Sequence, residues 1–298
     1  MIGLKMMKTA IAAAVFGVLA VAGSAQAVTT YGLTTDNGLF AFDSTTPNVI
    51  VSGNVVTGLQ TNEILHSIDF RPATGELFAL GSSSRLYTIN TTTYAATAIG
   101  AGPFSPALNG TSFDADFNPT VDRIRLVSDS DQNLRLNPIT GGVAAVDGTL
   151  SYAAPYTFLN PNVSAAAYTN NFAGATSTTL YTLDTATDTL NIQTVAAGGP
   201  TDGQQTIVGF LGFDATDVTG FDIYTVGGQN FALASLNTTT TATSLLYSIN
   251  LTTGQALPIG NFGGGKLVRD IAVVVPEPAT LTLAGMAVLG LAARRRRA

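Results

Sequence analysis

The sequence contains no cysteine and no tryptophan, and His66 is its only histidine. These absences exclude disulfides, thiol catalysis and cysteine-ligated metals. They also argue against a zinc site or a Ser-His-Asp triad. Charged residues are scarce as well, at 11% of the chain. A fold of this composition must close by packing and hydrogen bonding alone.

The N-terminus has the three parts of a secretory signal. A positively charged start precedes an apolar run at residues 10–23, and the small residues Ala25 and Ala27 follow. We expect a signal helix at 1–27, outside the folded domain, that signal peptidase removes after Ala27. The alternative, a buried first helix, fits poorly because the sequence beyond it lacks helical periodicity.

Residues 28–275 have the length of one large all-β domain. Seven basic and 18 acidic side chains lie in this range, which gives a net charge near −11. Such a surface argues against nucleic acid or an anionic membrane as the main partner.

An internal repeat organises this domain. The pattern apolar-x-apolar-Asp/Asn occurs five times, ending at Asp43, Asn90, Asn137, Asp184 and Asn250. The gaps are 47, 47, 47 and 66 residues. A period in the forties with several short strands per repeat is typical of a β-propeller. We attribute the long last gap to an insertion near residues 190–205, between a third and a fourth strand, because a hidden sixth blade would need a gap near 94.

The first unit of the repeat region lacks an inner strand, and the last segment supplies one. The first unit begins with a second strand at Thr30–Thr34, and residues 268–275 read as an inner strand without a blade of its own. Pairing them would close the ring and protect both edges. The sequence therefore predicts an all-β, five-bladed propeller closed by its C-terminal strand. A β-sandwich or a β-solenoid is the alternative.

The C-terminal residues 276–298 form a separate tail. Pro276-Glu277-Pro278 is followed by an apolar stretch at 281–293. Four basic residues then end the chain before its last alanine: Arg294, Arg295, Arg296 and Arg297. The arginines favour a cytoplasmic terminus, and the apolar helix expected here is short for a permanent span.

This tail resembles the PEP-CTERM sorting signal of Gram-negative bacteria that make exopolysaccharide. The resemblance implies transient anchoring in the inner membrane, cleavage near Pro276-Glu277-Pro278 by an exosortase, and transfer to the cell surface or extracellular matrix. A permanent single-span anchor is the alternative.

The repeat domain resembles an uncharacterised family of secreted bacterial propellers. The similarity lies in Asp116-Phe-Asn-Pro119, Val121-Asp-Arg-Ile-Arg-Leu126 and Gln132-Asn-Leu-Arg135. That family has no established activity, so the resemblance implies a fold and names no function.

Alternating oxygen ligands at Asp129, Asp131 and Asn133 could begin a calcium loop. An EF-hand-type loop would, however, need glycine where Leu134 stands and an acid where Thr140 stands. Because Asp and Asn are also ordinary turn residues, we predict no metal or cofactor, with Ca²⁺ as the alternative.

Three arginines of the third unit, Arg123, Arg125 and Arg135, could hold an anionic sugar or a carboxylate. The alternative is a structural role, in which these arginines form ion pairs between blades with Asp114, Asp116 and Asp122. The long link at 148–162 carries Tyr152, Tyr156 and Phe158, whose rings could stack on sugars or pack over the channel. We expect His66 to be structural.

The expected function is a non-enzymatic binding or structural propeller at the cell surface, with exopolysaccharide as a possible ligand. No catalytic residue is assigned. The alternative is a glycoside hydrolase or lyase acting on that polysaccharide through inner-strand carboxylates. Asp69, Asp116, Asp222 and Asp270 are the candidates for that role, although a turn role explains them more simply.

Overall fold

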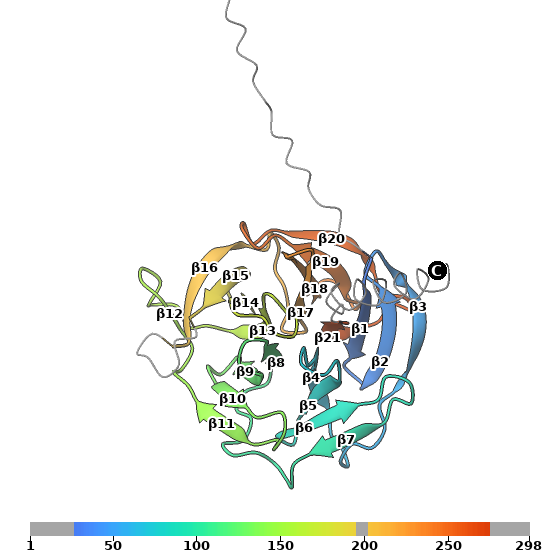
Figure 1. The fold of residues 1–298 in the computed structure, drawn as a ribbon. Helices are drawn as coiled ribbons and strands as arrows, with labels where there is room; N and C mark the ends of the chain where they lie inside the picture. Colours follow the sequence, from blue (N-terminus) through green and yellow to red (C-terminus); the bar gives the residue numbers. More distant parts are fainter. Residues whose placement is uncertain (1–26, 195–201, 275–298) are drawn as a thin grey trace, which may run out of the picture.

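A computed structural model describes residues 27–194 and 202–274. This part of the chain consists of strands and turns, without an α-helix. None of its segments is a helix long and apolar enough to cross a membrane. Five sheets surround a common axis, as Figure 1 shows, which confirms the predicted five-bladed propeller.

Each blade has four antiparallel strands, given below from the innermost to the outermost, as Figure 1 shows. Blade 1 contains β21 (Val268–Val273), β1 (Thr29–Thr34), β2 (Gly38–Asp43) and β3 (Thr46–Val55). Blade 2 contains β4 (Leu65–Phe70), β5 (Leu77–Gly81), β6 (Arg85–Ile89) and β7 (Ala96–Ile99). Blade 3 contains β8 (Phe113–Asn118), β9 (Arg123–Ser128), β10 (Asn133–Leu136) and β11 (Val143–Val146).

Blade 4 contains β13 (Val163–Tyr168), β14 (Leu180–Asp184), β15 (Thr189–Gln193) and β16 (Gln204–Phe210). A fifth strand, β12 (Ser151–Tyr152), adds to its outer edge in parallel with β16. Blade 5 contains β17 (Gly220–Val226), β18 (Gln229–Leu236), β19 (Leu245–Ile249) and β20 (Ala256–Asn261).

The ring closes as the sequence predicts. β21 pairs antiparallel with β1, with Val273 opposite Thr30 and Ile271 opposite Gly32. The last strand of the domain thus serves as the inner strand of the first blade. This pairing leaves neither strand as an open edge on which another chain could add.

Blade 4 departs from the predicted register. The motif that ends at Asp184 lies on β14, the second strand of its blade, whereas the other four copies lie on third strands. The third strand of blade 4 is β15 instead. The extra residues are therefore not confined to the predicted insertion at 190–205, since the β13–β14 connection at 169–179 is also long.

The hydrophobic core is divided among the interfaces between blades. Both faces of a blade are covered by its neighbours, so a middle strand such as β5 is buried at every position. Five apolar clusters fill the five interfaces. The cluster between blades 3 and 4 is the smallest, with six buried members around Tyr168 and Val127. Polar contacts supplement that interface.

The predicted signal segment up to residue 26, with Ala25, and the sorting tail at 276–298 lie outside the described residues. The predicted domain end, Val275, lies outside them as well. Ala27 is the first residue described, and it is exposed.

Candidate functional site at the propeller axis

Aspartates on the inner strands of four blades, all except blade 4, link their blade to the next. Asp69 of β4 accepts a hydrogen bond from the N–H of Phe117 on β8 (2.7 Å), and Asp116 of β8 accepts one from Tyr168 on β13 (3.0 Å). Asp222 of β17 accepts from Val273 on β21 in the same way (2.6 Å). These carboxylates satisfy backbone donors that no strand pairing reaches, and they lie within strands rather than in the predicted turns.

A second set of acceptors lies two residues earlier on the inner strands. Asp114 accepts from the N–H of Ala166 (2.7 Å), and Asp270 accepts from Ile68 (2.6 Å). Ser67 occupies this position on β4, where its hydroxyl donates to Asp114 (2.7 Å). The axis is therefore built from two polar layers, and five aspartates contribute to them.

Three of these carboxylates converge. One oxygen each from Asp69, Asp116 and Asp222 lies within 4.8 Å of the other two. All three residues are at most 4% exposed. The second oxygens of Asp69 and Asp222 have no hydrogen-bond partner. Of the three ion pairs among the described residues, none involves this carboxylate cluster (Asp69, Asp116 and Asp222).

Burial raises the pKa values of the aspartates at the propeller axis. Desolvation, reinforced by the charges of its neighbours in the cluster, raises the pKa of Asp69 and of Asp116 well above the ordinary value. Desolvation also raises the pKa of Asp222 and Asp114 to about 7. Each of these groups therefore tends to hold a proton near neutral pH, unless another positive charge replaces it.

A small cavity of about 120 Å³ lies where inner strands begin. It is lined by residues of blades 1, 2, 3 and 5, among them His66, Phe113, Thr219 and Arg269. His66 Nδ1 is 3.0 Å from a guanidinium nitrogen of Arg269, and its ring lies 4.8 Å from that of Phe113. Burial and the charge of Arg269 lower the pKa of His66 to about 4, so the imidazole is neutral and accepts the hydrogen bond.

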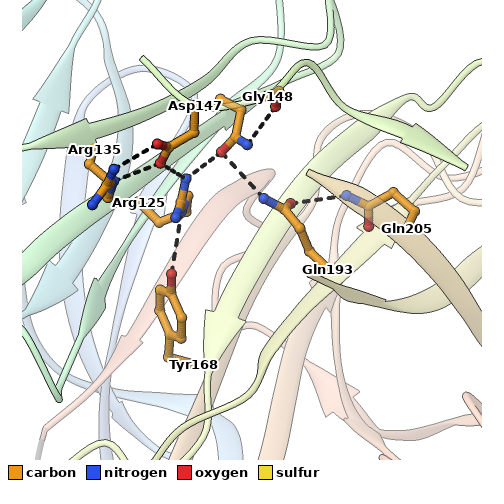
Figure 2. Close-up of polar contacts among 8 residues, drawn as sticks. Arg125, Arg135, Asp147, Gly148, Tyr168, Gln193 and Gln205 are labelled. Carbon is orange, nitrogen blue, oxygen red and sulfur yellow. Dashed lines mark hydrogen bonds and ion pairs between the residues drawn. The ribbon is translucent and has the colours of Figure 1, made fainter. Parts of the chain in front are cut away.

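The predicted arginine cluster forms an internal network, shown in Figure 2. Asp147 receives hydrogen bonds from Arg125 (2.6 Å) and from two nitrogens of Arg135 (2.7 and 2.8 Å). Burial acts to raise the pKa of Asp147, but the two arginines outweigh it and lower that pKa. The pairing partner is thus Asp147 of the same blade, and not the predicted Asp114 or Asp116.

The same network joins blades 3 and 4. Arg125 also donates to Asn133 (2.6 Å) and to the hydroxyl of Tyr168 on β13 (3.3 Å). Gln193 of β15 donates to Asn133 (3.3 Å) and accepts from Gln205 of β16 (3.0 Å). These contacts stabilise the interface that has the smallest apolar cluster, and they engage Nε and Nη1 of Arg125.

The remaining arginine and aspartate of this cluster lie apart from the network. Arg123 donates to the backbone carbonyl of Asp122 (2.8 Å). The carboxylate of Asp122 pairs with Arg71 of blade 2 instead, at 2.8 Å from Nε. This is an ion pair between blades, as expected for Asp122, although its partner lies outside the predicted cluster. The structure thus does not bring Arg123 together with Arg125 and Arg135 around one ligand.

The aromatic residues of the link before β13 divide into two groups. Tyr152 is buried, and its hydroxyl donates to Asp184 (2.8 Å). Tyr156 and Phe158 are 42% and 79% exposed, and their ring centroids lie 6.5 Å apart. Asn162, at the end of this link, donates to Asp217 of the cavity wall (3.0 Å). The end of this link therefore lies against the cavity wall.

The predicted calcium-loop residues have separate partners. Asp129 accepts from the backbone N–H of Thr111 (2.9 Å), and Asn133 is held by Arg125 and Gly148. Asp131 lies between them with one buried oxygen that lacks a partner. In the described part of the chain, the carboxylates that gather in a group of three are Asp69, Asp116 and Asp222, and not these loop residues.

Two family models match the sequence. The Domain of unknown function DUF4394 matches residues 38–272, which is most of the chain, and the protein belongs to this family. The PEP-CTERM protein-sorting motif matches residues 274–297 and confirms the identification of the tail. No curated protein matches the sequence.

Three solved structures share low sequence identity with this chain. Hydrazine synthase of Kuenenia stuttgartiensis is 10% identical over 70% of this chain and 51% of its own, with a TM-score of 0.39. The dihydro-heme d1 dehydrogenase NirN in complex with DHE is 10% identical over 77% and 43%, with a TM-score of 0.37. A protein from Lactobacillus plantarum is 15% identical over 82% and 70%, with a TM-score of 0.40. The chain spans about half the length of the first two.

Proposed function

We propose that this DUF4394 protein is a non-enzymatic, glycan-binding propeller that is exported, released from its sorting tail and retained at the cell surface or in the extracellular matrix. The observation that supports glycan binding is the exposed pair of rings, Tyr156 and Phe158. Adjacent exposed rings form an apolar patch, and such patches mark ligand-binding surfaces more often than single exposed side chains do. The C–H faces of a sugar chain are suited to cover two adjacent rings.

The inner-strand aspartates support binding without turnover. A glycosidase needs two carboxyl groups about 5 to 9.5 Å apart on either side of an accessible sugar bond. Here the oxygens of Asp69, Asp116 and Asp222 approach within 4.8 Å of one another, and the residues are buried. One oxygen of each carboxylate also accepts a hydrogen bond from a backbone N–H of a neighbouring blade. A structural role accounts for this geometry better than the alternative, hydrolysis.

The order of the two family matches supports the sorting route. β21 ends at Val273, and the sorting motif begins at residue 274, so the motif follows the closing strand directly. Exosortase processing would then separate the tail from a domain that is already closed. Mass spectrometry of protein released from cells tests this step. We expect a C-terminal peptide that ends near Pro276-Glu277-Pro278, and a released protein that still carries Arg294–Arg297 would contradict it.

Glycan binding is tested with the mature wild-type protein on a glycan array, and by pull-down with exopolysaccharide from the same organism. Tyr156→Ala and Phe158→Ala should each weaken binding about 2- to 10-fold, the loss expected for one aromatic contact. Phe210→Ala is the matched control, because Phe210 is an exposed aromatic on blade 4 that makes no ring contact among the described residues. Blank results in both assays would reject the proposal, and unchanged binding by Phe158→Ala would reject this site.

A further inference from the structure

The carboxylate cluster at the axis has the oxygens of a cation site. Three acidic residues from blades 2, 3 and 5 each bring one oxygen within 4.8 Å of the other two. Oxygens that bind one Ca²⁺ at about 2.4 Å can lie no more than about 4.8 Å apart. The corresponding positions of the other two blades are Ala167 and Ala272, each of which precedes the residue whose N–H donates to the neighbouring blade.

The unpartnered oxygens provide an independent observation. Oδ1 of Asp69 and Oδ1 of Asp222 are buried without a hydrogen bond, although both side chains are more than nine-tenths buried. A buried carboxylate oxygen without a partner is costly, and native structures rarely leave one in that state. The other oxygen of each residue is fixed by a backbone N–H, which holds the free oxygen in place.

We infer that Asp69, Asp116 and Asp222 together bind one divalent cation, Ca²⁺, at the centre of the propeller. The ion would satisfy the unpartnered oxygens and offset the repulsion among three carboxylates. No arginine, lysine or histidine forms an ion pair with the cluster in the described residues. Mg²⁺ is the less favoured ion, because it dehydrates reluctantly and retains several waters, whereas these three carboxylates are buried. The site is independent of glycan binding.

Protonation of the three carboxylates competes with binding of the cation. Without a cation, burial and mutual repulsion favour the protonated acids, since the pKa of each of the three carboxyls is raised. A measurement at about pH 8 separates the two states, because deprotonation then favours the metal. Chelation should be carried out with warming, since the buried oxygens release an ion only when the blades open locally.

Equilibrium dialysis of the mature protein against calcium at about pH 8 tests the inference directly. We expect one Ca²⁺ per chain and a Tm that rises by about 5 to 10 °C at a 100-fold excess over Kd. Asp116→Asn should lose the ion, whereas Asp131→Asn, the control in the predicted calcium loop, should retain it. No bound calcium, loss of the ion in Asp131→Asn, or tighter binding of Mg²⁺ would overturn the assignment.

A crystallographic measurement covers the case in which Asp116→Asn fails to fold. Wild-type crystals soaked in Tb³⁺, which takes similar oxygen ligands, should show an anomalous peak within bonding distance of Asp69, Asp116 and Asp222. A peak at Asp129 and Asp131 instead, or no ordered peak, would contradict the site.

Discussion

Asp270, on the closing strand β21, accepts a hydrogen bond from the backbone N–H of Ile68 on β4, at 2.6 Å. Its other oxygen accepts from the N–H of Ile271 (2.8 Å). The residue is almost fully buried, and burial raises its pKa well above the ordinary value. A single side chain thus joins the last strand of the domain to the second blade.

This contact makes the closure of the ring testable. Asp270→Ala leaves the N–H of Ile68 buried without an acceptor, so the free energy of unfolding should fall by about 1 to 3 kcal/mol. Asp270→Asn retains an amide oxygen in the same place and should lose less. Urea unfolding in chelator-treated buffer measures both variants. An equal loss in the two would show that the hydrogen bond does not matter.

Gly220 tests the close approach of two inner strands. A Cβ atom at this position of β17 would lie 2.3 Å from the Cα of Asp270 on β21. Gly220→Ala should therefore push the strands apart and destabilise the domain by about 1 to 3 kcal/mol. Gly102→Ala is the control, because nothing lies within 4 Å of a Cβ there. Thermal unfolding compares the two, and equal Tm values would contradict the packing.

The network at Asp147 predicts a larger loss of stability than the half-exposed ion pair between Asp122 and Arg71. Asp147→Ala leaves Arg125 buried without its counter-charge, which should cost about 3 to 5 kcal/mol. Asp122→Ala breaks the pair with Arg71, whose side chain is 10% exposed, but the Asp122 side chain is 37% exposed and water can enter the space that it leaves. That loss should be about 1 to 2 kcal/mol, between the values for an exposed and a buried pair. Chemical unfolding decides the matter, and similar losses would argue against the buried network.

Metal-free protein should become less stable as the pH rises from about 6 to about 8. The folded state holds protons on Asp114 and Asp222 up to a pKa of about 7, whereas the unfolded chain releases them near the ordinary value of 3.8. The folded state therefore binds more protons in this window, and its stability falls as the pH rises. Urea titrations in chelator at several pH values measure the slope, and a flat profile would contradict it.

His66 acts in the opposite sense at lower pH. Its pKa is lowered from 6.5 to about 4 in the folded state, so the stability it contributes is lost as the pH falls through that range. His66→Gln should remove this component of the acid-side slope and leave the slope above neutrality unchanged. The same urea titrations measure it, and an unchanged acid-side slope in the variant would contradict the shift.

Closure of the ring was predictable from the sequence because the strands can be counted in each repeat. The first repeat begins with a second strand at Thr30–Thr34 and lacks an inner strand, and the strand from Val268 has no blade of its own, so the two can pair. The predicted register of blade 4 was wrong because its third strand, Thr189–Gln193, lacks the apolar-x-apolar-Asp/Asn pattern and carries Asn191 and Gln193 instead. Those two amides are buried, and Gln193 serves the polar network between blades 3 and 4.

The candidate site was only partly predictable. Asp69 and Asp116 stand one 47-residue period apart, which places them at equivalent points of adjacent blades. Asp222 lies off that period, because the chain between blades 3 and 5 is longer, and its convergence with the other two depends on closing the ring. Asp147 was missed because it lies outside every repeat motif, and only the fold brings it to Arg125.

Glycan binding and the absence of turnover can both be tested by one measurement on a single sample. Purified mature protein is incubated with exopolysaccharide from the same organism and followed over time by size-exclusion chromatography with light scattering. We expect the protein to elute with the polysaccharide and the molar mass of the polysaccharide to stay constant. A molar mass that falls with time, and that stops falling in Asp69→Asn and Asp116→Asn, would contradict binding without turnover.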